Sequence, residues 1–354
     1  MHISLNEKCF RFTPNIVSLL LEIEEFKGGW AAHRSLGPVR LANLQRVATM
    51  ESIASSVRIE GARLTDEEVA RIMTSYLVTP AFASRDEESA AGVAALLHQI
   101  FDAWETMELS ESVILEMHGT LLKTSGRDGQ HCGRYKSVDN AVAAFDDHGR
   151  RIGIVLEAAT ALETPRLMRE LVEWTRFHLE LRHLPALIVI GMFIVCFLAV
   201  HPFEDGNGRL SRALTTLLLL RTGYGFAPYG SLDKEIEATR QSYFVCLRAT
   251  QKTLQTADPD WNIWVEYFLT SVAHQVRRLK AKIRDEQLLQ SMPETSIRII
   301  ELVRSHGPLS ISEMESMIGI SRYTLRDHCS ALVHRNRLQR VGAGRATKYI
   351  PKWQ

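Results

Sequence analysis

The chain has 354 residues, of which 45% are hydrophobic, so it is long enough for two or three domains with sizeable buried cores. A formal net charge of +1 excludes a protein that is polycationic or polyanionic throughout and makes any charge effect local. The five cysteines are scattered without a CxxC pair, which argues against a disulfide framework or zinc ribbon and favours a reducing cytoplasm. The N-terminus, MHISLNEKCFRF, has no pattern of a secretory signal.

The first strong helical pattern covers residues 41–59, where apolar residues recur at helical spacing and Gly61 follows as a stop signal. Thr65 and Glu68 then have the spacing of a capping box, which predicts a second helix running toward Tyr76. Further helices are predicted over residues 90–104, 113–123, 167–181, 186–200, 210–222 and 237–252.

Residues 134–154 interrupt the helices. There AspAspHisGlyArgArg separates ValAlaAlaPhe from IleGlyIleVal in the manner of a short hairpin. A two-stranded ribbon is marginally stable alone in water, so we expect it to lean on the helices.

Residues 186–200 contain no charge, but a spanning helix needs about 20 residues, so a buried core helix is predicted and no membrane partner. Residues 261–289 form a second long helical pattern whose latter half is basic. Ser291, Met292 and Pro293 punctuate it, and we expect a domain boundary there.

The segment HPFEDGNGRLSR, residues 201–212, directly follows the apolar run. Pro202 disfavours the α conformation at His201, so the helix should end near Val200 and present the imidazole at its mouth. Gly206, Asn207 and Gly208 can adopt positive φ angles that turn successive N–H groups inward. With a helix beginning near Leu210, such an anion nest would cradle phosphate.

The same segment carries groups for catalysis. Asp205 offers one hard carboxylate for Mg²⁺, while Arg209 and Arg212 lie three residues apart and can contact phosphate oxygens. His201 can act as a general base near neutral pH. The alternative is an ordinary tight turn with a polar residue at a helix end.

The segment resembles the signature of the Fic domain family, HxFx(D/E)GNGRxxR, at every fixed position. The likeness extends over about residues 41–252 and includes MetHisGlyThrLeu near Met117. It implies a mainly α fold: a helical bundle with a β-hairpin flap. It also implies transfer of AMP from ATP onto hydroxyl side chains of target proteins.

The resemblance assigns roles within the segment. His201 would deprotonate the incoming hydroxyl, Asp205 would hold Mg²⁺ and Phe203 would anchor the core. The intact Gly208 favours adenylyl over phosphoryl transfer, because relatives that transfer phosphate tend to replace this glycine. The implied phosphate-binding set is Gly206, Asn207, Gly208, Arg209 and Arg212.

SerValArgIleGluGly, which contains Ser56 and Glu60, resembles the family's inhibitory motif (S/T)xxxE(G/N). A carboxylate at a helix C-terminus costs roughly 0.3–1 kcal/mol, which a cationic partner would remove. In the family this glutamate pairs with the second signature arginine, here Arg212, and blocks the γ-phosphate position. Losing one partner of a buried pair costs roughly 3–5 kcal/mol, and a released Arg212 would need another anion. The alternative is an exposed glutamate paired with Arg58 or Arg63.

Three further positions have competing interpretations. Lys136 stands where relatives more often carry arginine. A lysine cannot make the bidentate contact of that arginine, which puts target recognition in doubt. Tyr243 resembles an aromatic residue that lines the base pocket, or is a core tyrosine. His178 and His183 are five residues apart, a poor match for one helical face, so we expect surface or core histidines rather than metal ligands.

After Pro293 the pattern changes to helices over 297–303 and 323–334, with a capping box at Ser310 and Glu313 between them. Two strands around a glycine-rich turn follow, an order that resembles a winged helix-turn-helix. From Ser321 onward eight Lys or Arg stand against one Asp, a local charge of +7 that suits DNA phosphates. The alternative is protein docking or oligomerisation. The candidate DNA-contacting residues are Arg322, Tyr323, Thr324, Arg326, Arg345 and Lys348.

The sequence therefore predicts an autoinhibited, Mg²⁺-dependent protein adenylyltransferase acting on a target protein or on itself. Removal of AMP, or a nucleotide-sensing DNA-binding transcriptional regulator, are the alternatives. A homodimer is expected from the family only. The expected regions are 1–110 with the inhibitory helix at about 41–60, a catalytic core over 111–255, a connecting helix over 256–292 and a winged helix over 293–354.

Overall fold

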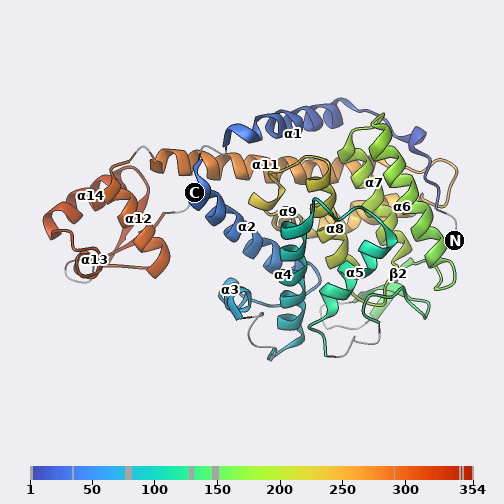
Figure 1. Cartoon of the computed structure of the whole chain (residues 1–354), viewed down its shortest axis with the longest axis horizontal. Helices are drawn as coiled ribbons and strands as arrows, with labels where there is room; N and C mark the ends of the chain where they lie inside the picture. The colour runs from blue at the N-terminus through green and yellow to red at the C-terminus, as the bar shows by residue number, and fades with distance from the viewer. Residues whose placement is uncertain are drawn as a thin grey trace. The chain divides into compact units, whose positions relative to one another are not determined.

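The computed structural model describes residues 3–33, 36–75, 82–126, 131–145, 151–290, 292–342, 344 and 347–352. The chain divides into two compact units, Met1–Lys280 and Ala281–Gln354. The predicted mainly α fold is confirmed: over its described residues, the larger unit is a bundle of helices with one two-stranded sheet (Figure 1).

The larger unit begins with a single 3-10 turn and continues as helices broken by one hairpin. In chain order its elements are η1 (Glu7–Cys9), α1 (Pro14–His33), α2 (Pro38–Ile59), α3 (Asp66–Ser75), α4 (Arg85–Ala103), α5 (Glu111–Leu122), β1 (Ala141–Phe145), β2 (Arg151–Glu157), α6 (Thr164–Leu181), α7 (Ala186–Val200), α8 (Asn207–Arg221), η3 (Ala227–Tyr229), α9 (Leu232–Ala238), α10 (Arg240–Gln251) and the part of α11 (Asn262–Gln290) up to Lys280.

Helix α7 is the centre of this unit. It is buried from Leu187 to Val200 and packs against α6, α8 and α10, which confirms the predicted buried core helix. A side chain at Gly191 would place its Cβ 3.2 Å from Phe268, so glycine lets α11 approach closely. Trp264 uses this approach, because its indole N–H donates to the Gly191 carbonyl at 2.7 Å.

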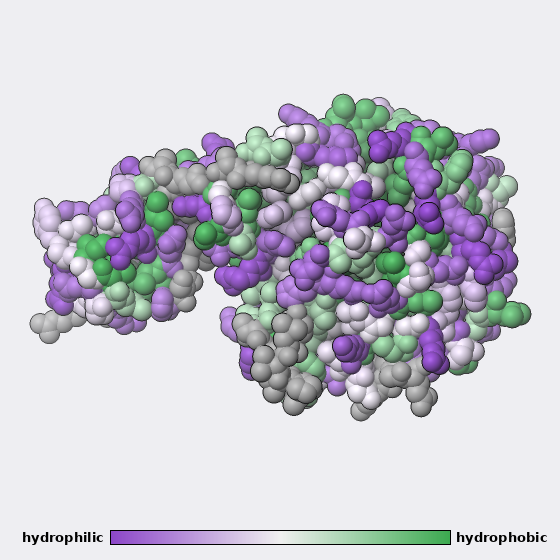
Figure 2. All heavy atoms as spheres, viewed as in Figure 1, coloured by the Kyte–Doolittle hydropathy of each residue, from purple (hydrophilic) through white to green (hydrophobic). Residues whose placement is uncertain are grey.

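Among the described residues, no helix is both long enough and apolar enough to cross a bilayer. On the face seen in Figure 2, hydrophilic residues cover much of the surface and hydrophobic ones are interspersed among them. The apolar side chains of α7 are buried by packing within the protein.

Helix α2 brings the predicted inhibitory segment against the signature segment. It packs against α4, α8 and α9, with its buried face running from Leu44 to Ile59. The predicted capping box follows it: the Thr65 N–H donates to a Glu68 carboxylate oxygen at 2.7 Å, and the Glu68 N–H donates to the Thr65 hydroxyl at 3.2 Å. Tyr76 lies outside the described residues.

The predicted hairpin is present but starts later than expected. Strands β1 and β2 pair antiparallel, with Ala141 opposite Glu157 and Phe145 opposite Arg151. The intervening residues 146–150 lie outside the described part. Lys136 precedes the hairpin and its N–H donates to the Pro202 carbonyl at 2.9 Å, which joins this segment to the signature loop.

The smaller unit has its own hydrophobic core, which includes Ile299, Met314, Leu325, Cys329 and Leu338. Its helices and strand pair occur in the predicted order, and the predicted capping box at the start of its second helix is present. Its identification as a winged helix stays a prediction. The elements are α12 (Glu294–His306), α13 (Ile311–Ile318), α14 (Arg322–His334), β3 (Leu338–Val341) and β4 (Lys348–Pro351).

Candidate active site

His201 ends helix α7, as the sequence predicts. It has φ 51° and ψ 62°, the left-handed conformation that costs a non-glycine residue roughly 1–2 kcal/mol. Burial, with a smaller contribution from the Lys136 cation, lowers the pKa of its imidazole to about 4. The ring is therefore neutral at physiological pH and can accept a proton. The carboxylates of Glu60 and Asp205 oppose this shift, which places all three groups in one site.

Lys136 holds the end of α7. It is buried, and its ammonium donates to the carbonyls of Val200 at 3.1 Å and His201 at 3.0 Å and to the Asn140 amide oxygen at 2.7 Å. Burial lowers the pKa of Lys136 to about 8. The sequence interpretation connected Lys136 with target recognition. In this structure its contacts instead fix the backbone that carries the candidate base.

The loop after His201 is tied together by Asn207 and Phe203. The Asn207 amide oxygen accepts from the Phe203 N–H at 3.0 Å, and its NH₂ donates to the Phe203 carbonyl at 2.7 Å. Phe203 is fully buried, as expected of a core anchor. Because the Asn207 side chain is committed to the loop, its backbone N–H is the group that remains to bind phosphate.

His118 on α5 contacts this loop at Phe203 and at the Asp205 carbonyl. Its ring stacks on Phe203 with centroids 3.8 Å apart. The Gly133 N–H donates to its Nδ1 at 3.1 Å, so the neutral ring carries its proton on Nε2. That N–H donates to the Asp205 carbonyl at 3.1 Å. The buried imidazole is thus a structural brace for the residue predicted to hold metal.

The phosphate cradle differs from the predicted nest. Within residues 201–212, all of them described, positive φ is found at His201 and Gly206 only. Gly206 is the left-handed N-cap, and Asn207 and Gly208 are already the first residues of α8, three residues earlier than expected. The predicted anion site thus corresponds to a helix N-terminus, and free N–H groups and a positive dipole end are features that attract phosphate.

Asp205 and Arg209 contact each other across this N-terminus. Arg209 Nη2 lies 2.8 Å from Asp205 Oδ2, and Arg85 Nη2 lies 3.3 Å from the same oxygen. Burial raises the pKa of Asp205, but Arg209, the Gly206 N–H and Arg85 outweigh it and leave the pKa below its usual value. The carboxylate is therefore ionised, and both ion pairs use Oδ2.

Arg212 is the buried centre of a second cluster. Its Nη2 donates to the Ser56 carbonyl at 2.8 Å and to Glu60 Oε1 at 3.0 Å, and its Nε donates to the Ser56 hydroxyl at 3.0 Å. The structure thus brings Ser56, Glu60 and Arg212 together as the resemblance implies. Arg58, one of the two alternative partners of Glu60, pairs instead with Asp66 at 2.7 Å.

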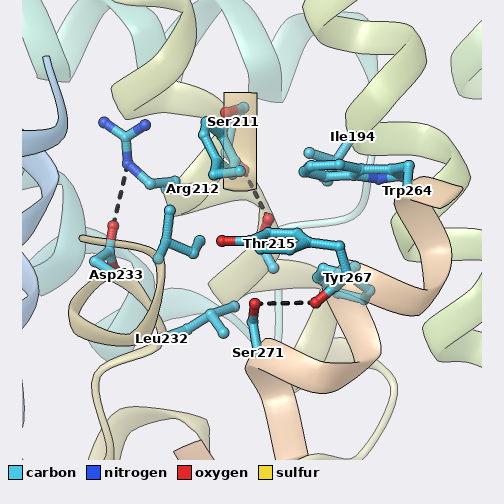
Figure 3. A pocket seen from close by; sticks show the side chains of 12 residues that line it. Ile194, Ser211, Arg212, Thr215, Leu232, Asp233, Trp264, Tyr267 and Ser271 are labelled. Atoms are coloured by element: carbon cyan, nitrogen blue, oxygen red, sulfur yellow. Dashed lines mark hydrogen bonds and ion pairs between the residues drawn. The ribbon is translucent and has the colours of Figure 1, made fainter. Parts of the chain in front are cut away.

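Asp233, at the start of α9, is a further partner that the sequence interpretation missed. Its Oδ1 lies 3.2 Å from Arg212 Nε, with both side chains buried (Figure 3). Burial raises the pKa of Asp233, and the Arg212 cation opposes that shift. The Glu60 side chain is 44% exposed, so the Glu60–Arg212 pair is not the fully buried pair considered above. Arg212 retains an anionic partner when Glu60 leaves.

Gly208 provides the room that Glu60 uses. A Cβ on Gly208 would lie 2.1 Å from Glu60 Oε1 and 3.3 Å from Arg212 Nη1. The Glu60 carboxylate therefore rests directly on the first turn of α8, at the predicted phosphate site. Any side chain at position 208 would push it away.

Tyr243 lies in the core and lines the same cavity as Arg212. It is 3% exposed, and burial raises its pKa to about 12. With Arg212, Asp233 and Thr215 it lines an internal cavity of about 20 Å³, enough for about one water (Figure 3). This position supports the core interpretation, and contact with a nucleotide base stays a prediction.

The candidate DNA-contacting residues lie in the smaller unit. Tyr323 is 76% exposed and Arg326 is exposed, but Arg322 Nε forms a 2.5 Å ion pair with Glu315. Lys348 lies 3.6 Å from Glu313, and Arg345 lies outside the described residues. Part of the predicted basic surface is thus neutralised by nearby acids.

Comparisons with known proteins agree with this geometry. The Fic/DOC family profile matches residues 108–219. The chain is 23% identical over 177 residues to the probable protein adenylyltransferase aq_aa38 of Aquifex aeolicus, covering 50% of this chain and 51% of that protein. It is 27% identical over 190 residues to protein adenylyltransferase fic-1 of Caenorhabditis elegans, covering 52% and 34%. The chain thus spans about half of the first relative and a third of the second.

Solved structures show the same fold over a longer stretch. A Fic family protein from Desulfovibrio desulfuricans superposes with a TM-score of 0.63 at 23% identity, covering 98% of both chains. A Fic domain containing signaling protein from Bacteroides thetaiotaomicron gives 0.60 at 25% identity, covering 75% of this chain and 97% of its own. The signature segment, the family profile and these folds agree, so residues 108–219 match a Fic/DOC domain within a chain that has the fold of Fic family proteins.

Proposed function

We propose that this protein is an adenylyltransferase that moves AMP from ATP to a hydroxyl side chain of a protein. The observation that carries the proposal is the neutral His201 imidazole beside an α8 N-terminus that offers free N–H groups together with Arg209 and Arg212. The names of the two curated relatives agree with it. The substrate class follows from a base suited to hydroxyl groups and an anion site suited to several phosphates.

The reaction balances with the residues present. His201 takes the proton of the hydroxyl as its oxygen forms a bond to the α-phosphorus. The bond from that phosphorus to the bridging oxygen of the β-phosphate breaks, and pyrophosphate leaves. The N–H groups of Asn207 and Gly208, with the Arg209 guanidinium, stabilise the charge on the phosphate oxygens.

Asp205 is the residue that would hold Mg²⁺. Its carboxylate is ionised and 38% exposed, and both of its ion pairs use Oδ2. One carboxylate with waters and nucleotide oxygens is a donor set that Mg²⁺ accepts. The ion would neutralise charge on the phosphates. Arg209 must then give up its contact with Asp205 to bind phosphate. The contact between Arg85 and Asp205 would compensate for this loss.

The Glu60 carboxylate acts as a brake in this proposal. It contacts Arg212 and rests on Gly208, where a terminal phosphate of ATP would be bound. A carboxylate and a phosphate cannot both occupy this position, because like charges repel and the space is limited. Because Glu60 is partly exposed at a helix end, its side chain can swing away without unfolding α2.

The test uses the full chain with Mg²⁺ and ATP labelled in either the α or the γ phosphate. Wild type, Glu60→Ala and Glu60→Ala/His201→Ala are compared on the protein itself and on a lysate. Label from the α position alone, increased in Glu60→Ala and absent from the double variant, is expected. The matched control is Glu67→Ala, which removes an exposed carboxylate from α3 and should behave as wild type.

Two results would contradict the proposal. Label from the γ position alone would assign phosphoryl transfer. Label that persists without His201 would remove the base from the mechanism. Removal of AMP, the reverse direction, is tested by adding labelled product to the same variants.

A further inference from the structure

A second group of metal-ligating side chains lies at the end of α6. His178 is in the last turn of this helix, and His183 follows the helix. The sequence interpretation set this pair aside because a five-residue spacing suits no single helical face. The structure changes that conclusion: Arg182 adopts a left-handed conformation with φ 54°, so the chain turns back and brings the second ring to the first.

The two imidazoles meet through ring nitrogens. His178 Nδ1 and His183 Nε2 are 3.2 Å apart. In a tetrahedral zinc site, with Zn–N distances of about 2.0–2.1 Å, two ligand nitrogens lie about 3.3 Å from each other. The observed separation therefore suits two ligands of one ion. It also suits a single N–H···N hydrogen bond, so a third group is needed to decide.

Glu7 provides the third group from the other end of the sequence. One oxygen of its carboxylate and the two ring nitrogens all lie within 4.8 Å of one another. Glu7 belongs to η1, which is held in place because Asn6 caps it and the Trp261 indole N–H donates to the Asn6 carbonyl at 2.9 Å. An imidazole pair with one carboxylate is a ligand set that zinc favours.

Neighbouring side chains hold His178 in place, and an open cleft beside His183 gives an ion access from solvent. His178 is buried, and the Trp174 ring packs against it with centroids 4.4 Å apart. His183 is exposed and lines an open cleft bordered by Arg176 and Arg182, so an ion can enter from solvent.

We propose that Glu7, His178 and His183 bind one Zn²⁺ ion, with water in the fourth position. None of these three ligands lies in the signature segment, which contains Asp205, the residue predicted to hold Mg²⁺. The ion would connect the N-terminal segment to the end of α6, two parts of the larger unit that are distant in sequence. Its binding free energy would therefore stabilise the folded chain.

The test is equilibrium dialysis of the untagged, chelator-stripped full chain against buffered Zn²⁺, with metal measured by mass spectrometry. One equivalent of zinc is expected for wild type. His183→Ala should weaken binding at least about tenfold and Glu7→Gln should weaken it less, because a neutral oxygen can still coordinate. His274→Ala removes an exposed histidine of α11 and should leave binding unchanged.

A second readout separates this site from adventitious thiol binding. Co²⁺ bound by nitrogen and oxygen ligands gives visible absorption without a thiolate charge-transfer band, and Cys9→Ser should retain it. Equal zinc affinity in wild type and His183→Ala would overturn the proposal, as would loss of binding in Cys9→Ser. Adenylyl transfer by His183→Ala should be unchanged in the presence of Mg²⁺, so this result is independent of the proposed function.

Discussion

At the scale of single residues, burial decides what His201 can do. An exposed histidine would be half protonated near pH 6.5 and would lose half of its capacity as a base there. His201 lies in a left-handed turn, and the Lys136 ammonium donates a hydrogen bond to its carbonyl. Burial of the imidazole lowers its pKa to about 4. Burial of His201 therefore accounts both for its fixed position and for its neutral form.

This pKa predicts the pH dependence of transfer. Since a lowered pKa keeps the base neutral to lower pH, kcat/KM of Glu60→Ala should stay nearly constant from pH 7 to about pH 5.5 and fall only toward about pH 4. Lys136→Met removes a cation that lowers the His201 pKa, so the acidic limb should move upward. Lys136→Arg is the control that keeps the charge. An acidic limb centred at 6.5 in Glu60→Ala would contradict this account of the base.

At the scale of elements, Arg212 connects α8 to both α2 and α9. Its bond to the Ser56 carbonyl and its ion pair with Asp233 are buried, while Glu60 is partly exposed. Asp233 therefore anchors this arginine from α9, whereas Glu60, the residue proposed as the brake, comes from α2 together with Ser56. If Glu60 moves away, the guanidinium keeps its contacts with Ser56 and Asp233.

The arrangement predicts unequal effects on stability. Glu60→Ala should lower the free energy of unfolding by less than about 1 kcal/mol, because a half-exposed pair contributes little. Asp233→Ala should lower it by about 3–5 kcal/mol, because it leaves the Arg212 charge buried with one partner fewer. Urea unfolding of the two full-length variants measures both values. Equal losses would show that Asp233 is not the anchor.

The signature segment was predictable because its functional groups are contiguous, so a turn and a helix start suffice to bring them together. Arg85 and Asp233 were missed because they come from other helices and have no pattern of their own, and His118 lay in the quoted MetHisGlyThrLeu without an assigned role. The predicted run of positive φ angles failed because α8 begins three residues early, at Asn207. The pairing of His178 with His183 depends on one left-handed residue that no periodicity reveals.

At the scale of the whole molecule, the chain consists of two units that have separate cores. The division lies at Lys280 and Ala281, within α11 and within the predicted connecting helix over 256–292, and the expected region boundary near Pro293 stays a prediction. The capping box at Ser310 and Glu313 and the extent of α14 were predictable from local patterns. Helix α12 is longer than the predicted 297–303, because it begins directly after Pro293 and runs to His306.

Separate cores predict separate unfolding. Leu325 is fully buried in the core of the smaller unit, so Leu325→Ala should cost about 2–5 kcal/mol there. Differential scanning calorimetry of the full chain should show one transition lowered and the other unchanged. Adenylyl transfer below the first transition should be kept. A single transition that moves as a whole would contradict the independence of the two units.

The most direct test of the central claim, that Glu60 occupies the position of a terminal phosphate, is a comparison of ATP and ADP binding. Isothermal titration calorimetry with Mg²⁺ would use full-length His201→Ala, which cannot turn over, and His201→Ala/Glu60→Ala. Removing Glu60 should tighten ATP about tenfold, roughly 1.4 kcal/mol, and ADP distinctly less, because the extra phosphate of ATP gains the contact with Arg212. Equal changes for the two nucleotides, or no change, would show that the carboxylate does not compete for that position.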